Sequence, residues 1–166
     1  MSSRRPTIPQ RPRPHLPPST LFLYGCGAGI LGVAFMTAGE KIEQLLTSRA
    51  NSYVPGATLA RLLGVGPLRS DRQLWLLNAA MHCGQGAAAG VLRAWMSDRG
   101  VRGPFGDLVF LGVRLLVDQT LENWSGVGAL PWTWPVNEQI IDIIHKTVFA
   151  LATGYFTDKW VQQGWR

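Results

Sequence analysis

Charged residues are scarce in this chain of 166 residues: they make up 16% of it, whereas ordinary soluble domains contain roughly 25%. Hydrophobic residues make up 46%. The polar side chains concentrate in the N-terminal tail and in the connections between apolar segments. This scarcity of charge argues against an ordinary soluble domain and favours a membrane protein.

Cysteine is also scarce, because Cys26 and Cys83 are the two in the chain and each lies in an apolar segment beside small residues. These positions favour packing over a disulfide framework or a zinc site. We expect both side chains to pack between helices.

Several signatures of known chemistry are missing. The sequence has no GxSxG, no P-loop, no GxGxxG that opens a βαβ unit and no CxxC. We therefore predict no cofactor. The net charge of +6 comes from scattered basic residues, which near the N-terminus alternate with prolines, so no nucleic-acid-binding face is predicted.

What the sequence does contain is a series of apolar segments. The first, residues 20–39, has no charged residue over the length needed to cross a bilayer. We predict an all-α fold, a four-helix transmembrane bundle over residues 19–161, after a disordered Pro/Arg-rich tail at 1–18. The predicted helices cover about 20–46, 73–97, 104–123 and 137–161.

Two of these segments carry a GxxxG motif, Gly25 with Gly29 and Gly86 with Gly90. Small residues at this spacing let two helix backbones approach closely. The motifs are equally compatible with packing inside one bundle and with a homo-oligomer.

The third and fourth segments contain ionisable residues. Arg114 and Asp118 together would cost about 5 to 7 kcal/mol to insert at a bilayer centre. Their (i, i+4) spacing predicts a structural ion pair that offsets this cost, and Asp142 and Lys146 have the same spacing. His145, beside the second pair, is the residue left over.

The tryptophans lie near predicted segment ends, which is typical of residues at a membrane interface. Lysines and arginines of the N-terminal tail, the 93–102 turn and the C-terminus outnumber those on the other side of the bundle. We therefore predict a multi-pass protein with both termini cytoplasmic.

Similar features follow one another in the two halves of the chain, which suggests two duplicated helical hairpins as a hypothesis. Duplication would bring Glu43, His82, Glu122 and His145 from four helices toward one axis. These four are the candidates for a metal site. The sequence lacks HExxH and the Glu-x-x-His of di-iron bundles, so we favour packing and hydrogen bonding over metal binding.

Three stretches resemble a family of small uncharacterised multi-span integral membrane proteins of bacteria and fungi: GEKIEQLLTSRANSYVPGATLARLLG, AMHCGQGAAAGVLRAW and DQTLENWSGVGALPWTWP. The resemblance covers roughly residues 20–160. It implies a multi-span membrane fold and no established activity, and it assigns no catalytic residue.

We predict that the bundle binds or passes a small or lipophilic molecule, or supports a membrane complex, with the lipid bilayer as its main partner. The predicted binding residues are Asn78, His82, Gln85, Asp118, Glu122, Asp142 and His145. A membrane enzyme of the isomerase or cyclase type is the first alternative, with His145 or His82 as base and Glu122 as acid. A soluble helical bundle is the second.

Overall fold

The computed structural model describes residues 15–65 and 70–165, and within them the chain forms helices and no strand. The helices are α1 Pro18–Thr47, α2 Val54–Leu62, α3 Asp71–Asp98, α4 Gly103–Trp124, a 3₁₀ turn at Pro131–Thr133, and α5 Val136–Gly164. The all-α prediction is confirmed. Sequence reasoning missed α2 and the 3₁₀ turn, and most of the predicted tail, residues 1–14, lies outside the described residues.

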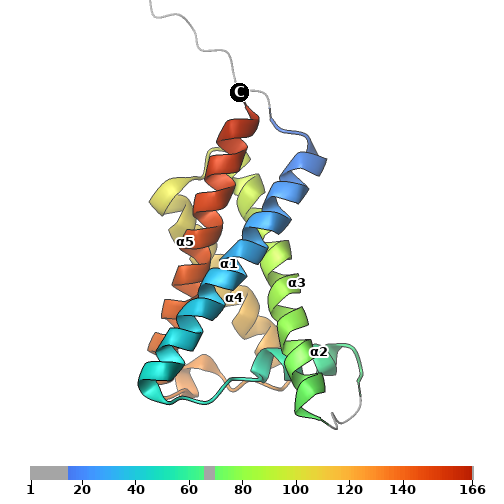
Figure 1. Cartoon of the computed structure of the whole chain (residues 1–166), viewed down its shortest axis with the longest axis vertical. Helices are drawn as coiled ribbons and strands as arrows, with labels where there is room; N and C mark the ends of the chain where they lie inside the picture. The colour runs from blue at the N-terminus through green and yellow to red at the C-terminus, as the bar shows by residue number, and fades with distance from the viewer. Residues whose placement is uncertain (1–14, 66–69, 166) are drawn as a thin grey trace, which may run out of the picture.

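The four long helices run lengthwise, while short α2 lies across one end (Figure 1). The start of the described chain and its C-terminus lie together at the opposite end, beside the turn between α3 and α4. There the Asp98 carboxylate accepts hydrogen bonds from the backbone N–H of Leu16, at 3.1 Å, and pairs with His15 Nδ1 at 2.6 Å. The site described below is built at the α2 end.

Local sequence explains where the helices begin. Proline in the first turn suits α1 and α4, because the first N–H groups of a helix have no intrahelical acceptor. Ser70 caps α3 by accepting a hydrogen bond from Gln73 N–H through its side chain. α1 ends where Ser48 adopts a left-handed conformation with φ of 58°.

The two GxxxG motifs meet inside the chain, α1 against α3. A Cβ added to Gly29 would overlap the carbonyl of Gly86, and one added to Gly90 would overlap the carbonyl of Gly25. The glycines therefore allow backbone-to-backbone contact, and they are already used within one bundle.

An apolar layer crosses the middle of the bundle. The rings of Phe110 on α4 and Phe149 on α5 lie 5.8 Å apart, and both side chains are buried. Met36 of α1 belongs to the same hydrophobic cluster, and Ala89 of α3 packs against it. The layer separates two groups of charged residues, one at each end of the bundle.

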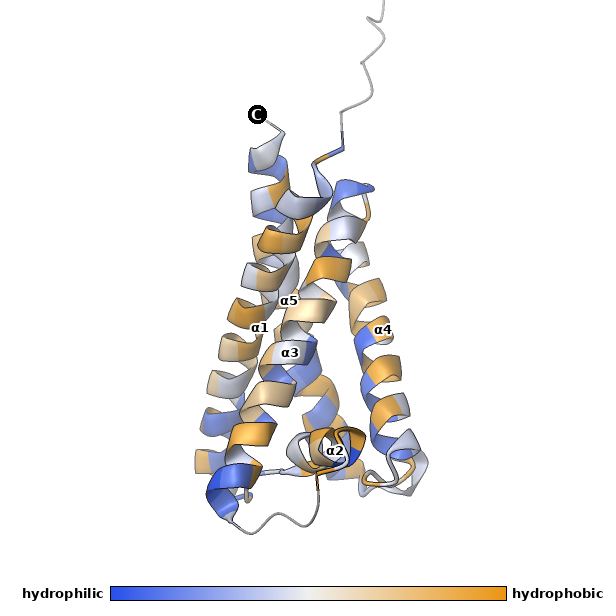
Figure 2. Cartoon of the chain, turned by 90° about the vertical axis from the view of Figure 1, so that its right-hand side faces the viewer, coloured by the Kyte–Doolittle hydropathy of each residue, from blue (hydrophilic) through white to orange (hydrophobic). Residues whose placement is uncertain are grey.

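Many large hydrophobic side chains lie on the outer surface. Figure 2 shows hydrophobic residues along the length of α4. Leu108 and Leu116 of this helix are each 67% exposed. Trp75, Trp124 and Trp132 are also exposed, near helix ends. Charged side chains, by contrast, are found among the buried residues of α3, α4 and α5.

Among the described residues, α1 alone is long and apolar enough to cross a membrane by length and composition. α3 and α5 are of similar length but include polar residues such as His82 and Lys146. The helical bundle is thus a property of the structure, while four membrane-spanning helices stay a prediction.

The expectation for the cysteines is wrong in part. Both are free thiols, but Cys83 is exposed on α3 and Cys26 is only half-buried. The inner face of α3 carries Asn78, His82 and Gly86. Cys83 lies outside this face, because residues of one helix face recur every three to four positions.

Candidate functional site

A cavity of about 400 Å³ lies between the long helices at the α2 end. Its walls come from all four long helices. The connections at 48–53 and 125–135 and the start of α2 also contribute to its lining. A cavity of this size is typical of small-molecule sites. The ionisable side chains that line it are Glu40, Arg49, His82, Arg114, Asp118, Glu122, Glu138, Asp142, His145 and Lys146.

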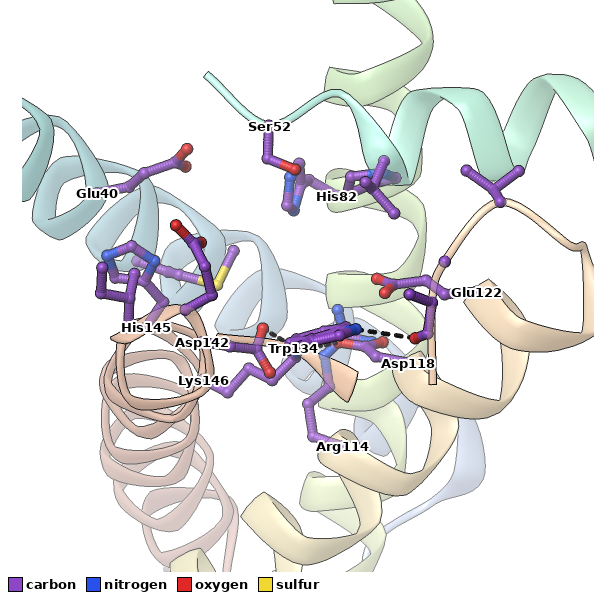
Figure 3. Close-up of a pocket in the computed structure, with 18 of the residues that line it drawn as sticks. Glu40, Ser52, His82, Arg114, Asp118, Glu122, Trp134, Asp142, His145 and Lys146 are labelled. Atoms are coloured by element: carbon purple, nitrogen blue, oxygen red, sulfur yellow. Dashed lines mark hydrogen bonds and ion pairs between the residues drawn. The ribbon is translucent and has the colours of Figure 1, made fainter. Parts of the chain in front are cut away.

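An ion-pair network forms the floor of this cavity (Figure 3). Arg114 Nη1 lies 2.5 Å from Asp118 Oδ1, one turn apart on α4, and Lys146 of α5 forms an ion pair with Asp142. Lys146 Nζ also lies 3.7 Å from Asp118 Oδ2, so the network links α4 to α5. Gln85 of α3 joins it by accepting a hydrogen bond from Arg114 Nη2 at 3.2 Å.

This network explains the charged residues inside apolar helices. Arg114 and Asp118 are 6% and 5% exposed, and an isolated charge at that depth would be strongly unfavourable. Because two cations and two carboxylates contact one another, the group as a whole carries no net charge. Arg114 and Lys146 are therefore already committed to protein carboxylates.

Glu122 differs from the paired carboxylates of the cavity. Its carboxylate points into the space between His82 and Trp134 (Figure 3). Within residues 15–65 and 70–165, no hydrogen bond or ion pair contacts this carboxylate. His82 Nδ1, nearby on α3, is likewise buried without a hydrogen-bond partner among the described residues.

A second ion pair lies at the rim. Arg49, in the connection after α1, donates to the Glu43 carboxylate from Nε and Nη2 at 3.1 and 2.9 Å. His145 Nε2 lies 3.9 Å from the same carboxylate, and Arg49 Nη1 lies 3.8 Å from Glu138. The rim therefore joins the end of α1 to the first turns of α5.

Glu43 follows the uncharged run of α1, and its side chain is partly exposed to water. The hydrogen bonds from Arg49, and next from Thr47, lower the pKa of the Glu43 carboxyl below its ordinary value of 4.5. The hydrogen bond to Glu43 raises the pKa of Arg49. This pair is therefore charged on both sides at neutral pH.

The lowered pKa gives a pH-dependent contribution to stability. Glu43 stabilises the folded state above its unfolded pKa of about 4.5, and the contribution is lost as the pH falls through the lower folded pKa. The thermal midpoints of the wild type and Glu43→Gln should differ by a constant amount near neutral pH and converge in acid. A difference that grows on acidification would contradict this assignment.

Most residues that the sequence singles out do line this cavity. His82, Gln85, Asp118, Glu122, Asp142 and His145 all belong to its walls. Asn78 does not, because its Oδ1 accepts a hydrogen bond from the N–H of Gly56 at 2.9 Å and so holds α2 against α3. Among the described residues, no group of three or more His, Cys, Asp or Glu side chains is placed to hold a metal ion, and Glu43 and Glu122 have different surroundings.

Sequence reasoning missed Glu40, Arg49 and Trp134 in this site. The position of Trp134 near a predicted segment end predicts an interfacial side chain, whereas the structure places it in the wall of the cavity. Its Nε1 donates to the carbonyl of Ala129 at 2.8 Å, which fixes the ring across the connection. Such loop contacts have no periodic signal in the sequence.

A second charged cluster lies beyond the apolar layer, at the end that holds the termini. Arg93 of α3 is fully buried and donates to Asp107 of α4, at 2.8 Å, and to both oxygens of Asp158 of α5, at 2.9 and 3.0 Å. Asp158 also accepts from the N–H of Gly103 at 2.8 Å. One guanidinium therefore holds three helices together.

No protein-family model, no curated protein and no solved structure matches this chain. The functional interpretation therefore depends on the geometry of the cavity and on the distribution of charge.

Proposed function

We propose that this chain is a multi-pass integral membrane protein that binds a small molecule in the cavity at its α2 end. The observation that carries the proposal is the cavity itself: about 400 Å³, lined by ionisable side chains from four helices, in a bundle that exposes large hydrophobic side chains. The bilayer would be the environment of the outer surface, and both termini would lie on its cytoplasmic side.

The distribution of residues supports the membrane part of the proposal. Soluble proteins bury apolar side chains and keep arginine, lysine and aspartate in water. Here Arg93, Arg114 and Lys146 are buried in pairs, while Leu108 and Leu116 face outward. That inversion suits a bundle that meets lipid outside and water in its cavity.

The apolar layer favours binding over passage. On α4 the order is Asp107, Phe110 and then Arg114, so the buried ring separates the two charged groups. Phe149 occupies the corresponding place on α5. In this conformation the cavity ends at Arg114 and Lys146, and the Arg114 guanidinium lies over the Phe149 ring, as in a binding site that is closed on one side.

Cysteine accessibility tests the proposal directly. In a chain without Cys26 and Cys83, Val54→Cys places a thiol in the cavity wall, and Leu116→Cys places one on the apolar outer face. We expect small polar thiol reagents to modify Val54→Cys in membranes and to leave Leu116→Cys unmodified, because a lipid-covered thiol is not in contact with water. Alkaline carbonate extraction should leave the protein in the membrane pellet.

The two positions distinguish the alternatives because Leu116 is 67% exposed in the structure. Rapid modification of Leu116→Cys, with extraction into the supernatant, would establish the soluble bundle and overturn the membrane proposal. Protection of both thiols would show that the cavity is not accessible to water, which would overturn the binding proposal.

Catalysis is the second candidate, favoured by one observation. Glu122 and His82 face the same cavity, as suits an acid and base pair. Among the described residues, the Glu122 carboxylate and His82 Nδ1 have no hydrogen-bond partner. The enzyme reading predicts that a strain lacking the protein loses a lipophilic product, and that His145→Ala or Glu122→Gln does not restore it. Unchanged product in the deleted strain would exclude this reading.

A further inference from the structure

The charges around the cavity are unequal. Five carboxylate side chains and three cationic side chains line it, so its formal charge is negative even before Glu43, the partner of Arg49, is included. A cleft lined mostly by charge of one sign, with walls of low polarity, raises the local concentration of ions of the opposite sign. The cavity should therefore attract cations and repel anions.

The cations that would otherwise attract an anion are already engaged. Arg114 pairs with Asp118, Lys146 with Asp142, and Arg49 with Glu43. An anionic ligand would have to replace one of these carboxylates and leave it without a partner, buried at Asp118 and partly buried at Asp142 and Glu43, which is unfavourable. Anions are therefore poor ligands for this site.

Glu122 is the carboxylate available to pair with a cationic ligand. It is the cavity carboxylate that no described cation or hydrogen-bond donor contacts, and it points into the open space (Figure 3). A half-buried carboxylate without a partner loses hydration without compensation. A ligand that brings one positive charge and N–H donors would provide that compensation.

Trp134 and His82 lie on either side of this carboxylate in Figure 3. An indole ring attracts a cation over its face, best when the site is shielded from water. His82 Nδ1 is buried and has no hydrogen-bond partner among the described residues, so in the Nε2–H tautomer it would accept an N–H. These groups suit an amine better than a bare metal ion.

We propose that the ligand of this cavity is a small organic cation, a protonated amine whose ammonium group pairs with Glu122 and lies against the ring of Trp134. The proposal rests on the proposed function, because it specifies the ligand class of the same cavity. Its geometric basis is a carboxylate, an indole ring and an imidazole that converge on one space of about 400 Å³.

Paired reagents test the charge preference. The Val54→Cys thiol is treated with a trimethylammonium-bearing and a sulfonate-bearing methanethiosulfonate, and each rate is divided by the rate with a free thiol in solution. We expect the cationic reagent to be favoured by roughly tenfold or more, as in clefts that focus charge. Glu122→Gln should reduce this preference, whereas Asp71→Asn, which removes an exposed carboxylate at the start of α3, should not.

Protection tests the ligand class. Benzylammonium should slow modification of the Val54→Cys thiol, and benzoate, which has a similar size and the opposite charge, should not. With Glu122→Gln, the benzylammonium concentration needed for half-protection should rise by at least about tenfold, the loss of one charge-assisted contact. Thermal midpoints of the variants establish that each is folded.

The outcomes distinguish failure of the organic-cation proposal from failure of the proposed function on which it rests. Equal rates for the two reagents, protection by benzoate, no protection by benzylammonium, or full protection with Glu122→Gln would overturn the organic cation and leave a water-filled binding cavity in place. A Val54→Cys thiol that reacts with neither reagent would overturn the proposed function itself.

Discussion

Replacing Arg93 with methionine should lower the free energy of unfolding by about 3 to 5 kcal/mol, the cost of breaking a buried ion pair by removing one partner. Arg93 is fully buried and pairs with Asp107 and Asp158. Methionine preserves much of the side-chain volume, so the loss reports the two carboxylates left without a cation. Unfolding by sodium dodecyl sulfate in mixed micelles, followed by helical circular dichroism, measures it.

Two further variants make this result specific. Arg99→Met removes an exposed guanidinium that lies 4.7 Å from the centre of the Trp95 ring, and should cost less than about 1 kcal/mol. Adding Asp107→Asn and Asp158→Asn to Arg93→Met should restore much of the lost stability, because the buried charges are gone. Equal losses for Arg93→Met and Arg99→Met, or no recovery in the triple variant, would contradict the account.

Gly29→Ala should destabilise the contact between α1 and α3 by about 1 to 3 kcal/mol, the usual cost of overpacking. The added methyl would meet the carbonyl of Gly86, which is backbone and cannot rotate aside. Gly90→Ala should behave in the same way because its methyl would meet the carbonyl of Gly25. The same micelle titration measures both.

Gly84→Ala is the matched control, since no atom outside its own helix backbone lies within 4 Å of a Cβ at that position. Helix propensity predicts a gain of about 0.5 to 1 kcal/mol there. If Gly84→Ala and Gly29→Ala changed stability alike, the effect would come from the helix backbone in general rather than from the α1–α3 contact.

The long helices could be predicted because their signals are local. Apolar periodicity and small-residue spacing are visible in the sequence, and Gly25, Gly29, Gly86 and Gly90 identified faces that do pack closely. The sequence could not show which faces meet. That choice depends on contacts between residues far apart in the chain, here about 60 residues.

The candidate site was predictable in its helical part. Arg114 with Asp118 and Asp142 with Lys146 have a spacing that reports a shared helix face, and the structure places both pairs in the cavity. Arg49 and Trp134 were not, because they lie in connections without periodicity.

The sequence also contains a pattern that predicts the burial of Arg93. Arg93 continues the face of Gly86 and Gly90 at a spacing of three residues, so the same periodicity that marks the glycines places its side chain inward. A count of Lys and Arg by membrane side assigned it to a surface turn. A charge that continues a small-residue face therefore predicts burial better than its distance from the helix end.

The Arg93 cluster also bears on the order in which the protein is made. Arg93 belongs to α3, whereas Asp158 comes from α5, which leaves the ribosome after α3 and α4. During synthesis the Arg93 guanidinium lacks the Asp158 carboxylate until the chain is 65 residues longer. A nascent chain that stops after α4 retains Asp107 alone against this charge, so completion of α5 is the step that gives the buried guanidinium its second carboxylate.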